Sequence, residues 1–292
     1  MKKKNKAIYL LFLMPFVYFA TACFVVWLVK TSGIYPSGSD TMYHVYRGDY
    51  VYNAIKSGNW YPLYDPAWYN GVEILRYWSP FPAYVMAFCQ YLAGGSQFGA
   101  YLFYIGGVCF LGACVWPFIG RGFNRPYLGA FIGLLWFFMP NNLCAIFIEG
   151  NLARSLSMIF LPVFIYSVYK YLYNHKLRYI PLMVFTFLLM ELCHLGYAGM
   201  VAIAVIIYGI VYMIQKGRKK AVLDVVISMI FGFMLLGIWL VASLRGGITS
   251  LDNSENMANF FQNLWITINP FERLTRGFEY FYFGFATLIV IV

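Results

Sequence analysis

One short polar segment, residues 37–49, brings an acid, an imidazole and a guanidinium together in an otherwise apolar chain. If Ser39 caps a helix that starts there, Asp40, His44 and Arg47 recur at i, i+4 and i+7 and share one helical face. A carboxylate held beside two potential cations at the rim of a membrane can serve as a general base or a metal ligand. Neither a membrane anchor nor a packing helix needs that combination, so this segment is the first candidate site of chemistry.

The same side chains also have plainer interpretations. An aspartate at the start of a helix often serves only as its N-cap, and this is the alternative for Asp40. His44 is either a ligand for a divalent metal ion or an interfacial histidine whose hydrogen bonds are satisfied within the protein. The residue types and their spacing leave both pairs of alternatives open.

Two further polar clusters interrupt apolar runs. Glu149 and Arg154 lie within residues 147–154, where they either form a structural salt bridge with each other or contact a substrate. Glu191 and His194 lie three residues apart in apolar surroundings. Ionisable groups at such positions are functional candidates, and mutual neutralisation is the structural alternative. The candidate catalytic carboxylates are therefore those of Asp40 and Glu149.

The composition defines the surroundings in which these residues must work. Of the 292 residues, 62% are hydrophobic and 11% are charged, whereas soluble domains carry about 25% charged residues. We therefore expect an all-α polytopic membrane protein. The formal net charge of +10 does not indicate a nucleic-acid partner, because the basic residues gather in short loops between apolar runs, as on the inner side of a bilayer.

Apolar runs of the length that crosses a bilayer predict the spanning helices. A single membrane domain, 1–292, is the simplest division of the chain. We expect the chain to be the N-terminal part of a longer protein, because the last run has too few residues to cross. The predicted spans are 7–29, 97–119, 126–143, 152–173, 179–193, 196–214 and 221–244, followed by an incomplete one at 278–292.

The basic loops predict a multi-pass protein of the cell membrane with a cytoplasmic N-terminus. This orientation requires that residues 81–93 do not cross, and about 13 residues are indeed short for a crossing of about 20. We expect an interfacial helix there. A large first outer loop, 30–80, then holds many Tyr and Trp side chains, which either stack on sugars or form an interfacial belt. Most acidic residues also fall outside, including Asp252, Glu255 and Glu272.

Several motifs together resemble the multi-spanning GT-C glycosyltransferase superfamily, and more narrowly the bacterial membrane family labelled 6-pyruvoyl-tetrahydropterin synthase-related. The resemblance covers essentially the whole chain. It rests on Ser39-Asp40 with His44, on His194, and on the motifs WYPLYD at 60–65, WYNG at 68–71, YWSPFP at 77–82 and EGNLAR at 149–154.

The superfamily resemblance implies a GT-C-like helical bundle that transfers a sugar from a polyprenyl-phosphate donor to an acceptor on the outer face. In such enzymes an acid of the first outer loop serves as base or metal ligand, which implies that role for Asp40. Arg47 or Arg154 would stabilise the departing lipid phosphate. The remaining substrate-binding candidates are His44, Arg76 and His194.

The resemblance is incomplete in two respects: no DxD-like or Asp-Glu pair follows Asp40, and the C-terminal half, where acceptor-specific modules often lie in this superfamily, is expected to lie beyond these residues. A divalent metal cofactor is therefore neither required nor excluded. Pterin chemistry is not expected, because a soluble pterin synthase needs a three-histidine zinc site and His44, His175 and His194 lie in separate segments. The alternatives to a transferase are a lipid or polysaccharide transporter (flippase) and a noncatalytic membrane assembly protein. Membrane lipid is an expected partner in each case, and the acceptor is not identified.

Overall fold

A computed structural model describes residues 2–36, 38–68, 71–76 and 78–245. The regular secondary structure of this part of the chain is helical, apart from an isolated bridge between Asp65 and Val72 in the loop within residues 57–80. Five helices are long and apolar enough to cross a membrane, or six if one bent pair counts as a single span. The chain is thus an all-α polytopic membrane protein, as the composition predicts.

The chain divides into two units, Met1–Ser243 and Leu244–Val292. Most of the second unit lies outside the described residues, and so do the predicted span at 278–292 and the acids Asp252, Glu255 and Glu272. The single domain proposed for 1–292 therefore stays a prediction.

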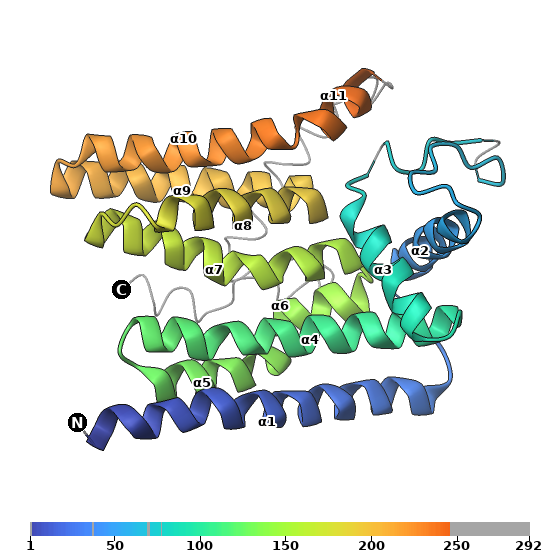
Figure 1. Ribbon diagram of the computed structural model, residues 1–292, viewed down its shortest axis with the longest axis horizontal. Helices are drawn as coiled ribbons and strands as arrows, with labels where there is room; N and C mark the ends of the chain where they lie inside the picture. Colours follow the sequence, from blue (N-terminus) through green and yellow to red (C-terminus); the bar gives the residue numbers. More distant parts are fainter. Residues whose placement is uncertain (1, 37, 69–70, 77, 246–292) are drawn as a thin grey trace, which may run out of the picture. The chain divides into compact units, whose positions relative to one another are not determined.

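The long helices of the first unit follow the apolar runs closely. Each begins or ends within a few residues of a run because polar or basic side chains interrupt the hydrophobic sequence there. Figure 1 shows how these helices pack along their lengths. They are α1 (Lys2–Ser32), α4 (Gln97–Gly122), α7 (Leu152–Asn174), α8 (Tyr179–Cys193), α9 (Leu195–Lys216) and α10 (Lys219–Leu235).

One span is interrupted and extends further than the apolar run predicts. The run 126–143 becomes α5 (Pro126–Leu135), a 3₁₀ turn η1 (Trp136–Phe138), the short α6 (Pro140–Leu143) and a π-helical turn η2 (Cys144–Ile148). Met139 is extended, with φ −63° and ψ 121°, because the proline ring that follows it disfavours helical backbone at that position. The interruption lets the chain continue to Ile148 before it turns back into α7.

A second interruption follows α10. The helix α11 (Gly237–Arg245) is bent by 63° from α10, so the predicted span 221–244 is one bent pair rather than a straight helix. The indole N–H of Trp239 in α11 donates to the carbonyl of Leu75 at 2.7 Å. This bond fixes the start of α11 to the segment that directly precedes α3 (Phe81–Leu92).

The polar loop between α1 and α4 contains the helix α2 (Thr41–Lys56) and the helix α3, which occupies the stretch 81–93 expected to be interfacial. The Asp65 carboxylate accepts a hydrogen bond from Tyr46 of α2 at 2.6 Å and one from the backbone N–H of Ala67 at 2.9 Å. Asp65 is buried, so its role is to fold the loop onto α2.

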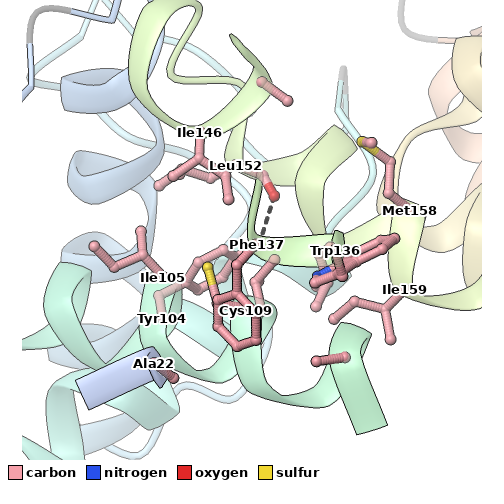
Figure 2. Packing of buried hydrophobic residues seen from close by; sticks show 14 of the residues in the cluster. Ala22, Tyr104, Ile105, Cys109, Trp136, Phe137, Ile146, Leu152, Met158 and Ile159 are labelled. Carbon is pink, nitrogen blue, oxygen red and sulfur yellow. Dashed lines mark hydrogen bonds between the residues drawn. The ribbon is translucent and has the colours of Figure 1, made fainter. Parts of the chain in front are cut away.

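Large apolar side chains hold α1, α4, α5 and α7 together (Figure 2). The fully buried hydroxyl of Tyr104 in α4 donates to the carbonyl of Leu152 at 2.8 Å, at the first residue of α7. In the same way Tyr18 of α1 donates to the carbonyl of Ala130 in α5 at 2.7 Å. Each bond contributes about 1 kcal/mol and, more importantly, satisfies a buried polar group.

The connections that carry clusters of basic residues lie at one end of the bundle (Figure 1). The N-terminus and the α4–α5, α7–α8 and α9–α10 connections lie at one end, and they carry the basic clusters predicted to be cytoplasmic. The helices α2 and α3 lie at the opposite end. We call these the basic end and the α2 end.

Candidate functional site

The chain approaching α2 lies directly against the turn that precedes α7. The backbone N–H of Asp40 donates to the carbonyl of Glu149 at 3.0 Å, and the Ser39 hydroxyl donates to the same carbonyl at 3.1 Å. These two bonds join segments that are separated by about 110 residues in the sequence. We call the contact between residues 38–41 and 149–151 the junction.

Two glycines make this close approach possible. Gly150 has φ +67°, and a Cβ on it would lie 2.1 Å from Oγ1 of Thr41. A Cβ on Gly38 would lie 2.5 Å from the backbone nitrogen of Gly150. Both distances are far below van der Waals contact, so any larger residue must separate the two segments.

The structure corrects the expected start of α2. Asp40 occupies the N-cap position and the helix starts at Thr41, whereas the sequence predicted that Ser39 would be the cap. The Asp40 side chain makes no capping hydrogen bond. Among the described residues, the hydrogen-bond partner of its carboxylate is the Ser39 hydroxyl at 3.2 Å, whose single proton is shared with the Glu149 carbonyl. The carboxylate is only partly buried, so it is available to a proton donor from outside the protein.

Glu149 and Arg154 form the salt bridge that the sequence offered as one alternative. The Glu149 carboxylate lies 2.8 Å from Nη1 of Arg154, and the arginine side chain is 8% exposed. Glu149 directly follows the π-helical turn η2, and such turns often occur at functional sites. Asn151 caps α7, because its side-chain oxygen accepts the backbone N–H of Arg154 at 2.9 Å.

His194 lies between α8 and α9 and faces the same turn. Its Nδ1 accepts the backbone N–H of Tyr197 at 3.0 Å, so the neutral ring carries its proton on Nε2. That Nε2 lies 3.4 Å from the side-chain nitrogen of Asn151, which is also a donor because the Asn151 oxygen already accepts from Arg154. Two N–H donors therefore converge, as they would around a shared acceptor atom.

The electrostatics of His194 place it among the charged residues of the junction. Burial is the main cause that lowers its pKa, and the positive charge of Arg154 lowers it further. The carboxylates of Asp40 and Glu149 act in the opposite direction. The imidazole is therefore neutral near pH 7 and donates a hydrogen bond rather than a full charge.

His44, one helical turn after Asp40, is buried on α2. Burial is the main cause that lowers its pKa to about 3, and the electrostatic effects of Arg47 and His194 contribute to the same shift. His44 is therefore also neutral at physiological pH. The influence of His194 on this pKa shows that the two imidazoles belong to one neighbourhood, although they come from α2 and from the α8–α9 break.

Arg47 turns away from the junction toward the loop before α3. Its Nη2 donates to the carbonyls of Trp78 at 3.3 Å and Ser79 at 3.4 Å, and its guanidinium lies 5.4 Å from the ring centre of Tyr43. The residue is 1% exposed and its Nε has no hydrogen-bond partner among the described residues. Arg47 therefore attaches the loop to α2, and the candidate phosphate contact predicted for it remains a proposal.

The other candidates lie apart from the junction. Arg76 forms a salt bridge with Glu73 in the polar loop and shows no described contact with Asp40 or Arg154. Glu191 is buried in α8, where its Oε2 has no hydrogen-bond partner among the described residues. No ion pair joins Glu191 to His194 in that part of the chain, so these two residues do not neutralise each other there.

The three histidines do not form one metal site. His175 ends α7 at the basic end, whereas His44 and His194 are at the α2 end. Across the residues that the structure describes, no three His, Cys, Asp or Glu side chains are grouped as metal ligands. The groups that the junction and its surroundings supply are thus the partly exposed Asp40 carboxylate, the Glu149–Arg154 ion pair and two converging N–H donors.

The sequence did not single out Asn151 or the two junction glycines. Asn151 had a detectable signal, because an asparagine that follows a glycine and precedes an apolar run is typical of a helix N-cap. Its second amide donor toward His194 had no signal, since the two residues are 43 positions apart.

The family described as 6-pyruvoyl-tetrahydropterin synthase related domain, a membrane protein, matches residues 75–292. No curated protein and no solved structure matches the chain.

Proposed function

The chain belongs to the 6-pyruvoyl-tetrahydropterin synthase related family of membrane proteins, and we propose that it is a membrane glycosyltransferase that uses a polyprenyl-phosphate sugar. The single observation that carries the proposal is the junction. It joins the backbone of Asp40, whose carboxylate is partly exposed, to the backbone of Glu149, and Glu149 is paired with the buried Arg154.

Asp40 is the proposed base. The hydroxyl of the acceptor transfers its proton to the carboxylate while its oxygen attacks the anomeric carbon of the sugar. The bond between that carbon and the phosphate oxygen breaks, and the polyprenyl phosphate leaves with the electron pair. The Ser39 hydroxyl, 3.2 Å from the carboxylate, orients it without neutralising its charge.

Arg154, Asn151 and His194 are the proposed phosphate ligands. The leaving phosphate gains negative charge, which a buried guanidinium and N–H donors stabilise more strongly than water does. Donation from Nε2 of His194 and from the Asn151 amide to one phosphate oxygen would satisfy the two donors, which now lie 3.4 Å apart. Glu149, which the sequence makes a catalytic candidate, is in this proposal the residue that positions Arg154.

The remaining roles follow from the surroundings of the site. The lipid chain of the donor would lie along the apolar flanks of α7 and α9, whose outward side chains include Ile165, Ile203 and Ile207. The separation of basic loops from the α2 end supports an extracytoplasmic site in the cell membrane with the N-terminus in the cytoplasm. His44, Arg47 and Arg76 stay secondary candidates for substrate contacts. The proposal does not require a divalent metal at Asp40, and it is compatible with one.

The direct test is sugar transfer by the full-length protein in liposomes. Synthetic polyprenyl-phosphate sugars would be supplied as donors with a membrane extract of the producing cell as the source of acceptors. We expect release of polyprenyl phosphate together with a labelled product, and no transfer from nucleotide sugars. Failure of every polyprenyl-phosphate sugar to react in a protein of verified fold would overturn the proposal.

A further inference from the structure

The basic end of the bundle carries a cavity that the proposed reaction does not use. It has a volume of about 590 Å³ and lies between the end of α7 and the turn that joins α9 to α10. We call it the basic cavity. The lining side chains that matter for its chemistry are Tyr171, His175, Arg218, Lys219, Lys220 and Asp224.

The charge inside the basic cavity is predominantly positive. Arg218, Lys219 and Lys220 contribute three cations, and no salt bridge joins any of them to a carboxylate in the described part of the chain. The single lining carboxylate, that of Asp224, accepts a hydrogen bond of 2.5 Å from the hydroxyl of Tyr171. The cations therefore retain an uncompensated field, which attracts an anion into the concavity.

The cavity is also a built feature and not only a row of surface lysines. His175 adopts φ +50° at the end of α7, and its Nε2 is in hydrogen-bond contact with Nη1 of Arg218. Because an arginine only donates, Nε2 of the imidazole is the acceptor in this contact. This contact connects the α7 end to the α9–α10 turn. The first turn of α10, which begins at Lys219, adds backbone N–H groups without helical acceptors.

Apolar side chains next to the cavity identify the kind of anion. Ile214, shortly before the turn in α9, is 76% exposed, and Leu223, in the first turns of α10, is 56% exposed. Both helices carry such side chains on their outer flanks, where a membrane would place acyl chains. We propose that the basic cavity binds the phosphate of an anionic membrane lipid, with the acyl chains along α9 and α10.

Lipid binding can be measured on the purified full-length chain by native mass spectrometry and by thermal shift in detergent. We expect phosphatidylglycerol to bind and to raise the melting temperature, whereas phosphatidylcholine has little effect. The triple variant R218Q/K219Q/K220Q should lose at least tenfold in phosphatidylglycerol affinity. A matched control, R121Q/R125Q/K216Q, removes the same charge from the same end outside the cavity and should stay within about threefold of the wild type.

A second variant changes affinity in the opposite direction. Asp224→Asn keeps an oxygen for the Tyr171 hydroxyl and removes the only lining carboxylate, so phosphatidylglycerol should bind at least about twofold more tightly. Equal losses in the two triple variants would overturn the proposal, because they would reveal general electrostatic attraction. An equal effect of inorganic phosphate at the same concentration would also overturn it, since a free anion would then suffice. None of these results depends on sugar transfer.

Discussion

Replacing Gly150 by alanine tests whether the junction is as tight as the structure shows. The added Cβ would lie 2.1 Å from Oγ1 of Thr41 and 2.6 Å from the backbone nitrogen of Thr41. Thr41 is fully buried at the first turn of α2, so it cannot move into solvent to relieve the overlap. We therefore expect the segment that carries Asp40 to separate from the turn that carries Glu149.

The expected cost has two parts. An alanine at φ +67° carries about 1–2 kcal/mol of backbone strain. Overpacking of a buried contact adds about 1–3 kcal/mol. Gly33 supplies a matched control, because it has φ +69° and a Cβ there would meet nothing within 4 Å. Gly33→Ala should therefore be destabilised by the backbone strain alone. The difference in unfolding free energy between the two variants, about 1–3 kcal/mol, gives the cost of overpacking at the junction.

The assay is chemical unfolding of each purified variant in detergent, followed by sugar transfer well below the unfolding midpoint. Gly150→Ala should be less stable than Gly33→Ala by the stated difference and should lose more than tenfold in turnover. Gly33→Ala should transfer at the wild-type rate within about twofold. Equal stability of the two alanine variants would refute the argument that residues 38–41 and 149–151 are in backbone contact.

Three further predictions concern individual side chains. Glu149→Gln should lower the free energy of unfolding by about 1–3 kcal/mol, because its partner Arg154 is buried. Glu73→Gln should lower it by less than about 1 kcal/mol, because the Glu73–Arg76 pair is about one-third exposed. Similar losses in the two variants would contradict the argument that burial makes the Glu149–Arg154 pair more important. Asn151→Ser keeps a side-chain oxygen that can cap α7 but removes the amide donors. The free energy of unfolding should change by less than about 0.5 kcal/mol, while the KM for the lipid-phosphate donor should rise about tenfold. An unchanged KM would show that Asn151 does not bind the phosphate. Because the pKa of His44 is lowered to about 3, the folded state binds a proton at His44 less readily than the unfolded state does. The free energy of unfolding should therefore fall as the pH drops below about 6.5, by about 2 kcal/mol at pH 5 in unfolding titrations. His44→Gln should abolish most of this pH dependence, and an unchanged pH dependence would show that His44 does not cause it.

The helical architecture could be predicted well from the apolar runs. The stretch 179–193 is a single helix with those bounds, since polar or helix-breaking residues stand at both of its ends. The run 126–143 was harder to interpret, because hydropathy does not register the extended residue that Pro140 imposes on Met139. The bend between α10 and α11 was missed for a similar reason, since the two helices together form one apolar run.

The candidate site could be predicted only in part. The types and spacing of Asp40 and His44 predicted a candidate site at the start of α2. The Glu149–Arg154 ion pair was one of two predicted alternatives, because the two residues lie only five positions apart in the sequence. The contact between Asp40 and Glu149 could not be predicted, because it joins residues 109 positions apart through backbone atoms, which carry no sequence signal. The contact of Arg47 with Trp78 could not be predicted either, because the two residues are 31 positions apart, and the phosphate contact of Arg47 stays a prediction.

The most direct test of the central claim compares two isosteric variants of α2 and its cap. Asp40→Asn removes the proposed base, whereas Asp49→Asn changes an acid nine residues later whose side chain accepts a hydrogen bond from Gln90. Sugar transfer from a polyprenyl-phosphate donor should fall about 10²–10⁴-fold in Asp40→Asn and stay within about threefold of the wild type in Asp49→Asn. Full turnover by a correctly folded Asp40→Asn protein would contradict the account.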